Sequence, residues 1–171
     1  ASDVYKRQRS KRSPNEGGIR TPVMVRWPGQ IAQKFDEETL VSSIDLAPTI
    51  LKACGVPVPP SMKGIDLRDR EALLKRNAIF GAAFAHDVFD VTRPTLSMQT
   101  RYVVTGEWKL LLHHSGQVPG KAPELYNLSN DPAEETDLTA KHPNKVKELR
   151  RRSTHGGRGQ RMLPDSRAPF F

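Results

Sequence analysis

Residues 101–112 read Arg101-Tyr-Val-Val-Thr-Gly-Glu-Trp-Lys-Leu-Leu-Leu112 and give the clearest fold signal in the chain. Two runs of β-forming residues flank a short turn that contains Gly106, a pattern typical of a β-hairpin. Trp108, Leu110 and Leu112 alternate along the second run, so they share one face of the predicted strand. The sequence therefore predicts an antiparallel hairpin in the second half of the chain.

Shorter runs on either side of this hairpin predict the rest of a small sheet. Residues 78–84 form a compact apolar run typical of a buried strand, and residues 125–128 predict a further short strand that ends before Asn-Asp-Pro. Asn144 is a suitable N-cap for a final helix whose Val146 and Leu149 would point inward. The second half is therefore predicted to be a small antiparallel sheet with a packed helix.

In the first half, residues 22–27 (Pro-Val-Met-Val-Arg-Trp) precede a Pro-Gly turn. Val23, Val25 and Trp27 alternate with the residues between them. Such alternation, closed by a turn signal, is typical of a strand. We therefore expect a strand at residues 22–27.

A helix with clear signals at both ends is predicted next. Ser43 or Asp45 can cap its start, and Gly55 can end it. A start at Asp45 fits better because Pro48 then lies in the first turn, where proline is tolerated. We expect Asp45 to be a cap or first-turn residue rather than a metal ligand, and we expect a short surface helix within residues 64–76.

Together these elements predict an α/β chain with an α+β appendage. Residues 1–10 show no periodicity and are predicted to be non-native or disordered, while residues 11–76 form the end of an α/β core. Residues 77–152 are predicted to form a carboxy-terminal α+β subdomain. The last stretch, 153–171, again lacks periodicity and is predicted to be a disordered tail.

The net charge of +8 lies at the two ends of the chain. Residues 1–20 carry six Lys or Arg and two acidic residues, residues 150–171 carry six and one, and residues 21–149 carry fifteen and sixteen. A nucleic-acid-binding domain concentrates its basic side chains on a folded face, so we expect no nucleic-acid partner. No apolar run reaches the ~20 residues of a membrane helix, so we expect no membrane span.

The first half also contains a familiar motif. Lys11-Arg-Ser-Pro-Asn-Glu-Gly-Gly-Ile-Arg-Thr-Pro22, followed by a short apolar run and Trp-Pro-Gly29, resembles a signature found late in sulfatases of the alkaline phosphatase superfamily. The blocks at residues 43–55, 106–110 and 124–134 are similar to later parts of the same family, in the same order. The resemblance covers about residues 11–152.

This resemblance implies the carboxy-terminal part of an alkaline-phosphatase-like sulfatase fold and hydrolysis of sulfate esters, on sulfated carbohydrate or aryl substrates. Such enzymes use a formylglycine made within a Cys/Ser-x-Pro-x-Arg motif, together with a calcium ion held by Asp and Asn. Cys54 precedes Gly-Val-Pro-Val and does not match that motif. We therefore expect the nucleophile and the metal ligands to lie in a missing amino-terminal portion of the same protein, without which this chain is inactive. A periplasmic or extracellular location is implied for the whole protein.

Two residues are candidates for contact with the substrate. Lys11 is a compact cation with three hydrogen-bond donors, which suits an oxygen of a sulfate group, and the resemblance implies this electrostatic role. His86 follows the predicted strand at 78–84 and could bind substrate or donate a proton, although a loop histidine with a local partner is the simpler interpretation. No metal ligand set is predicted within the chain.

Glu16 and Arg20 lie four residues apart and are expected to pair, with a structural role in holding the loop. Three other interpretations of the chain stay open. It could belong to a phosphodiesterase or phosphatase of the same superfamily, it could be a non-catalytic binding or structural remnant, or, least in keeping with its charge distribution, it could bind nucleic acid.

Overall fold

The computed structural model describes residues 13–87 and 89–155. The described residues fall into two compact units. One unit is Arg20–Ile79, and the other joins the residues up to Ile19 with those from Phe80 onward. The predictions for residues 1–10 and for 156–171 lie outside the described residues.

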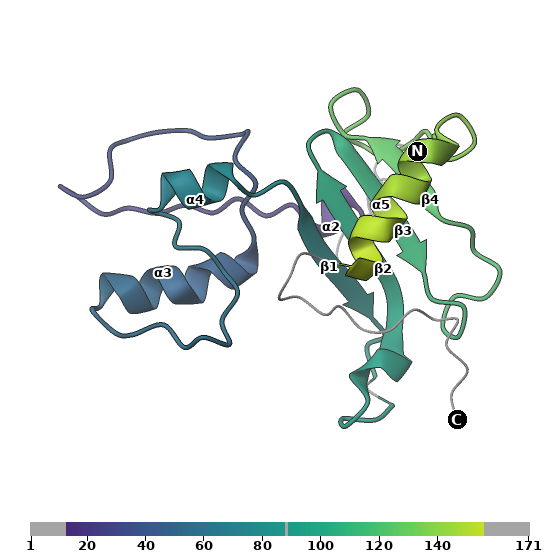
Figure 1. Cartoon of the computed structure of the whole chain (residues 1–171), viewed down its shortest axis with the longest axis horizontal. Coiled ribbons are helices and arrows are strands. Elements are labelled where there is room, and N and C mark those ends of the chain that lie inside the picture. Colours follow the sequence, from purple (N-terminus) through teal and green to yellow (C-terminus); the bar gives the residue numbers. More distant parts are fainter. Residues whose placement is uncertain (1–12, 88, 156–171) are drawn as a thin grey trace, which may run out of the picture. The chain divides into compact units, whose positions relative to one another are not determined.

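The unit that begins again at Phe80 contains a four-stranded sheet in the order β1-β2-β3-β4, and we call it the sheet unit (Figure 1). Its strands are β1 (Ile79–Phe84), β2 (Met98–Thr105), β3 (Trp108–His113) and β4 (Glu124–Asn127), and a 3₁₀ turn at Pro94–Ser97 precedes β2. The pairs β2–β3 and β3–β4 are both antiparallel. The predicted hairpin and the two flanking strands are therefore confirmed, but β1 is half-buried rather than buried as predicted.

The hairpin turn has two residues, because Thr105 pairs with Trp108. Gly106 has a φ of +54°, in the left-handed region that two-residue hairpin turns require and that glycine adopts without strain. A second glycine, Gly81 of β1, makes room for a neighbouring ring. A Cβ at that position would lie 2.1 Å from the ring of Tyr102 in β2.

Helix α5 (Pro143–His155) crosses the sheet and contacts β2 and β3 (Figure 1). Leu149 is fully buried, as predicted, and Val146 is half-buried. The helix continues through His155, so the predicted boundary of a disordered tail at residue 153 is wrong by three residues. The buried apolar core of the sheet unit consists of Met98, Val103, Leu110, Leu111, Leu112, Leu125, Tyr126 and Leu149.

The Arg20–Ile79 unit contains a 3₁₀ turn at Ser43–Asp45, helix α3 (Leu46–Ala53) and helix α4 (Arg70–Leu74). Asp45 immediately precedes α3, and Pro48 lies in its first turn, as expected. Helix α4 falls within the stretch where a short surface helix was predicted. The local signals for both helices are confirmed.

The strand predicted at residues 22–27 is absent from this unit, where the same residues have no regular structure. Val23, Met24 and Val25 are 45%, 91% and 53% exposed. A strand needs a neighbour that pairs with its backbone N–H and C=O groups, and alternation in the sequence does not supply one. The structure offers these residues no such neighbour within the described part of the chain.

Candidate functional site

Of the two predicted substrate-contacting residues, the structure describes only one. Lys11 lies outside the described residues. His86 lies just beyond the end of β1, where its side chain is 73% exposed and its Nδ1 lies 3.3 Å from the carboxylate of Asp87. The partner of His86 is therefore the adjacent residue, Asp87. No group of candidate catalytic side chains surrounds His86 among the described residues.

The Glu-Gly-Gly motif forms a single helical turn, α2 (Glu16–Ile19). The residue before it organises this turn. The Asn15 carbonyl accepts the backbone N–H groups of Gly18 and Ile19 at 2.8 and 3.1 Å, and the Ser13 hydroxyl donates to the Asn15 side chain at 2.8 Å. We call residues 13–19 the motif loop. Its local hydrogen bonds leave the Glu16 carboxylate available for a distant partner.

That partner is Lys109, in the middle of the sheet unit. The Lys109 ammonium lies 2.8 Å from the Glu16 carboxylate and 3.0 Å from that of Glu134. The backbone N–H of Glu16 donates to the second oxygen of Glu134 at 2.5 Å, which closes a triangle among the three residues. The side chains of Lys109, Glu134 and Glu16 are 0%, 1% and 15% exposed, so the whole ion cluster is withdrawn from water.

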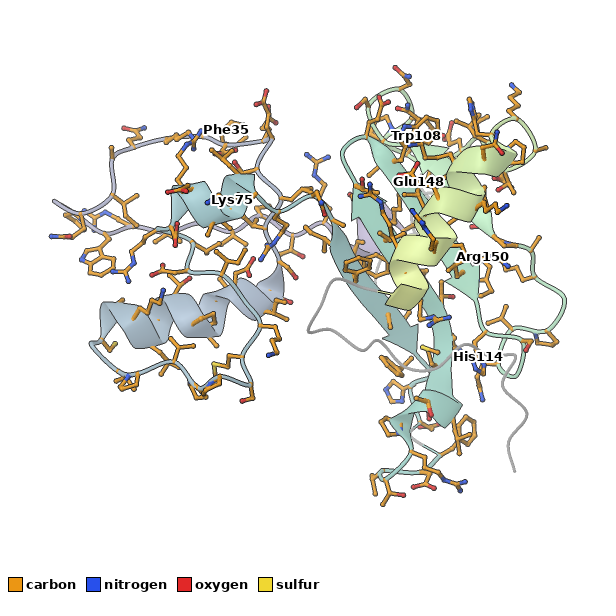
Figure 2. The ribbon with its side chains drawn as sticks, in the orientation of Figure 1. Phe35, Lys75, Trp108, His114, Glu148 and Arg150 are labelled. Atoms are coloured by element: carbon orange, nitrogen blue, oxygen red, sulfur yellow. The ribbon has the colours of Figure 1, made fainter. Side chains whose placement is uncertain are left out.

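The ion cluster lies on the sheet face opposite α5. The ring of Trp108, which is labelled in Figure 2, meets the ring of His142 just before α5, and the ring centres are 5.1 Å apart. Side chains alternate along a strand, so Lys109 points away from the face shared by Trp108 and Leu110. Trp108, Leu110 and Leu112 therefore share one face, as predicted, while Lys109 and Leu111 are buried on the other face.

Tyr102 borders the ion cluster on the neighbouring strand. The Lys109 ammonium lies 5.5 Å from the centre of its ring, within the range of a cation–π interaction. Burial and, to a lesser extent, the negative charge of Glu16 raise the pKa of Tyr102. The phenol therefore stays neutral at physiological pH, and its ring adds a favourable partner for the buried ammonium.

A tightly hydrogen-bonded turn presents Glu134 to Lys109. The Asn127 side chain accepts the N–H groups of Ser129 and Asn130 at 3.1 Å each, and the Asp131 carboxylate accepts those of Glu135 and Thr136 at 3.0 and 2.8 Å. Glu134 has a φ of +58°, in a region that costs a residue with a Cβ roughly 1–2 kcal/mol. The turn thus holds Glu134 in a conformation that its own backbone disfavours.

The predicted pairing of Glu16 with Arg20 is wrong. The Glu16 carboxylate pairs with Lys109, 93 residues away, and not with Arg20. The missed signal is a lysine inside the apolar run Trp-Lys-Leu-Leu-Leu, since a charged side chain in a buried strand requires a partner. Both Lys109 and Glu134 belong to blocks that resemble the sulfatase family. Their role is visible only once the sheet brings those blocks together.

The Arg20–Ile79 unit also contains a fully buried charged residue, Asp45. Its buried carboxylate receives Arg76 through both guanidinium N–H₂ groups, at 2.5 and 2.7 Å, and the backbone N–H groups of Ser42 and Ile65 at 2.7 and 2.8 Å. Burial alone would raise the pKa of Asp45, but these hydrogen bonds outweigh it and hold the pKa below its ordinary value. Asp45 thus precedes α3 as expected, and its side chain joins three segments of the unit.

The resemblance implies a calcium ion whose ligands lie in the amino-terminal portion of the protein. Within residues 13–87 and 89–155, no three His, Cys, Asp or Glu side chains come together in a way that could hold a metal ion. In the same part of the chain, no helix combines the length and the apolar character needed to cross a membrane. The ion pair of Lys109 with Glu16 attaches the motif loop to β3.

Comparisons with known proteins identify relatives of this chain. The family model for the carboxy-terminal part of N-sulphoglucosamine sulphohydrolase matches residues 7–155, which include both the motif loop and the sheet. Arylsulfatase K of Xenopus laevis is 27% identical over 84% of this chain, and arylsulfatase K of Danio rerio is 30% identical over 84%. An N-acetylgalactosamine-6-O-sulfatase of Bacteroides thetaiotaomicron is 25% identical over 81%. The chain spans about a quarter of the length of these relatives (27% in each case).

Solved structures show the same fold. A structure connected with the metabolism of multiple glycosaminoglycans by Bacteroides thetaiotaomicron matches with a TM-score of 0.57 and 21% identity, covering 72% of this chain and 28% of that one. A second, solved in complex with its substrate D-glucosamine-2-N,6-O-disulfate, matches with a TM-score of 0.50 and 22% identity, covering 67% of this chain and 23% of that one. The predicted fold, the carboxy-terminal part of an alkaline-phosphatase-like sulfatase, is confirmed. The chain belongs to the family defined by the carboxy-terminal domain of N-sulphoglucosamine sulphohydrolase, a family of sulfatases.

Proposed function

We propose that this chain is the carboxy-terminal part of an enzyme that hydrolyses sulfate esters. The observation that carries the proposal is the family match over residues 7–155, because it spans the motif with Lys11 and the sheet to which that motif is anchored. The relatives named above are sulfatases along the same stretch of sequence. The activity itself belongs to the whole protein, of which this chain supplies one part.

Within that enzyme, Lys11 is the residue of this chain that contacts the sulfate group. A lysine ammonium stabilises the negative charge that builds on a sulfate oxygen as the ester bond breaks. A formylglycine nucleophile, and the ligands of a calcium ion that would polarise the sulfate when bound, belong to the amino-terminal portion of the protein. Alone, this chain is therefore inactive.

The substrate class we propose is a sulfated carbohydrate or a small aryl sulfate. One relative is named for its action on N-acetylgalactosamine 6-O-sulfate, and one structural relative was solved with a disulfated glucosamine. His86 is a secondary candidate for substrate contact, because its exposed ring is free to meet a ligand. For the whole protein we propose a periplasmic or extracellular location, as the resemblance implies.

The test uses the full-length protein, produced together with a formylglycine-generating enzyme. Calcium-dependent turnover of an aryl sulfate and of a 6-sulfated amino sugar is measured for the wild type, Lys11→Ala and His86→Gln. We expect the wild type to be active and Lys11→Ala to lose at least about 100-fold in kcat/KM, the scale of removing one transition-state contact.

Two other outcomes would replace the proposal. Faster turnover of an aryl phosphodiester than of any sulfate ester would identify a phosphodiesterase of the same superfamily. Absence of turnover on either class, in a protein shown to carry formylglycine, would identify a non-catalytic binding or structural module.

A further inference from the structure

Helix α5 concentrates positive charge on the surface of the sheet unit. Residues 143–153 contain five Lys or Arg and one acidic residue, Glu148. Part of the positive charge at the carboxy-terminal end of the sequence therefore lies on a helix, which packs against β2 and β3 (Figure 1). Lys147 and Arg151 are exposed and lie about one turn apart on the outer side of this helix.

Glu148 offsets only part of this charge. Its carboxylate lies 2.9 Å from the Lys145 ammonium and 3.3 Å from the Arg152 guanidinium. The hydrogen bond from Lys145, followed by the charges of Arg152 and Arg151, holds the pKa of Glu148 below its ordinary value. Figure 2 labels Glu148 and Arg150 on this helix. One carboxylate thus faces several cations, and α5 keeps a surplus of positive charge.

The stability of the helix does not account for this surplus. The first turn of a helix favours acidic side chains, but the first turn of α5 has none and contains Lys145. Lys147 and Arg151 are like charges four residues apart, a pair that destabilises a helix. An anionic ligand on the outer side of α5 would relieve this repulsion.

The open position of these cations favours a polymeric ligand over a small anion. An isolated ion pair on an exposed surface contributes little, because water and salt screen it. A polyanion contacts several cations at once and releases bound counterions, so weak contacts add up to a measurable affinity. Lys147 and Arg151 are separated by about 6 Å along the helix axis, the rise of four residues, which lets one polymer reach both.

We propose that the outer side of α5, around Lys147 and Arg151, binds a sulfated polysaccharide. The inference rests on the proposed function for the class of its ligand, since one substrate class proposed above is a sulfated carbohydrate. The ion cluster that holds the motif loop lies on the opposite face of the sheet, so it does not cover α5. The surface is therefore a second contact for a polymeric substrate, separate from the sulfate group that reacts.

A nucleic acid is the other polyanion that a basic helix can bind. Residues 143–153 contain no aromatic side chain on which bases could stack. The helix also packs along β2 and β3, so only its outer side is presented to a ligand. These features favour the polysaccharide, and binding of DNA becomes an outcome of the test.

The test measures binding of labelled chondroitin 6-sulfate by the full-length protein as a function of salt concentration. We expect the double variant Lys147→Gln, Arg151→Gln to bind at least about 10-fold more weakly than the wild type at low salt. The slope of log affinity against log salt concentration should fall by about 2, one for each lost contact. No binding by the wild type, or a loss below about twofold in the variant, would overturn the inference.

Two controls separate this surface from a general effect of charge. Arg70→Gln, Lys75→Gln removes the same charge from α4, where these side chains are 62% and 72% exposed, and should change affinity less than about twofold. Chondroitin stripped of its sulfate groups should bind the wild type at least about 10-fold more weakly than the sulfated polymer. Binding of duplex DNA as tight as that of chondroitin 6-sulfate would contradict the proposed ligand.

Hydrogen exchange locates the contact within the molecule. Saturating chondroitin 6-sulfate should slow exchange of the α5 amides at least about threefold in the wild type, because the bound polymer relieves repulsion among the cations. The double variant should show little slowing. Slowing elsewhere in the protein, with α5 unchanged, would overturn the assignment to this helix.

The inference and the proposed function fail in different ways, because binding does not require turnover. A protein that turns over no sulfate ester but binds chondroitin 6-sulfate through α5 overturns the proposed function alone. An active enzyme whose binding is the same in the wild type and in the α5 double variant overturns the polysaccharide surface alone.

Discussion

The two units of the chain are stabilised in different ways. The sheet unit buries apolar side chains on both faces of its strands and encloses the ion cluster around Lys109. The Arg20–Ile79 unit leaves large apolar side chains exposed, among them Met24 at 91% and Phe35 at 84%, and its fully buried side chains include the charged Asp45. The sheet unit is thus held mainly by its core, whereas in the Arg20–Ile79 unit ion pairs and hydrogen bonds to buried carboxylates, such as those of Asp45 and Asp66, are prominent. We therefore expect the most destabilising substitutions to lie at apolar positions in the sheet unit and at polar positions in the Arg20–Ile79 unit.

The largest effect on stability is expected from Leu149→Ala in the sheet unit. Leu149 is fully buried where α5 packs on β2 and β3, and its truncation should cost about 3 kcal/mol, the usual price of a core cavity. Hydrogen exchange of the β2 and β3 amides in the full-length protein measures this loss. Leu74→Ala, at a position that is 62% exposed in α4, is the matched control. Equal effects of the two changes would show that the sheet unit lacks the core described above.

Asp45→Asn should be the most damaging polar change in the Arg20–Ile79 unit. The amide keeps the shape of the side chain but leaves the buried Arg76 guanidinium without its charged partner, at a cost of about 2 kcal/mol. Exchange of the α3 amides is the measurement. Asp69→Asn, at the N-cap of α4, should change little because asparagine caps helices as well as aspartate does. An unchanged α3 in Asp45→Asn would remove the distinction between the two units.

Acid should weaken the edge of the sheet at β4. Burial alone would raise the pKa of Glu124, but the nearby His113 ring and Lys121 ammonium, 3.6 and 2.8 Å from its carboxylate, outweigh burial and lower the pKa from 4.5 to about 2. Stability from Glu124 is therefore fully present above pH 4.5 and is lost as the pH falls toward 2. We expect β4 amides to lose protection across this window in the wild type and less so in Glu124→Gln. Parallel pH profiles for the two proteins would contradict this assignment.

The smallest effect is expected from Ile50→Ser on α3. Ile50 is 61% exposed, and substitutions at exposed positions usually change stability by less than about 0.5 kcal/mol. Exchange of the α3 amides in the full-length protein again provides the measurement. A loss above about 1 kcal/mol would show that the amino-terminal portion of the protein covers this side chain, because buried apolar surface contributes on that scale. That result would mean that the Arg20–Ile79 unit also depends on buried apolar side chains, as the sheet unit does.

The elements that were predicted correctly have signals formed by residues close together in the sequence. The two-residue turn at Gly106 between β-forming runs indicates the hairpin, and the cap at Asp45 with Pro48 in the first turn indicates α3. The strand at residues 22–27 was wrongly predicted because a strand depends on a partner that alternation does not reveal.

The ion cluster could not be predicted from the sequence for a related reason. Glu16 and Lys109 are separated by 93 residues, so nothing local connects the motif loop with β3. Charge spacing instead suggested the nearby Arg20 as the partner of Glu16. The resemblance to sulfatases identified each block of sequence correctly, but the contact between the blocks appears only in the structure.

Hydrogen exchange of the motif loop shows whether the sheet holds this loop through Glu16. In the full-length protein, a peptide covering residues 13–19 is compared between the wild type and Glu16→Gln, with a peptide from β3 as the internal reference. We expect exchange in the loop to become at least about 10-fold faster in Glu16→Gln, because a charged hydrogen bond is lost, while exchange in β3 stays unchanged. Unchanged exchange of the loop would contradict the claim.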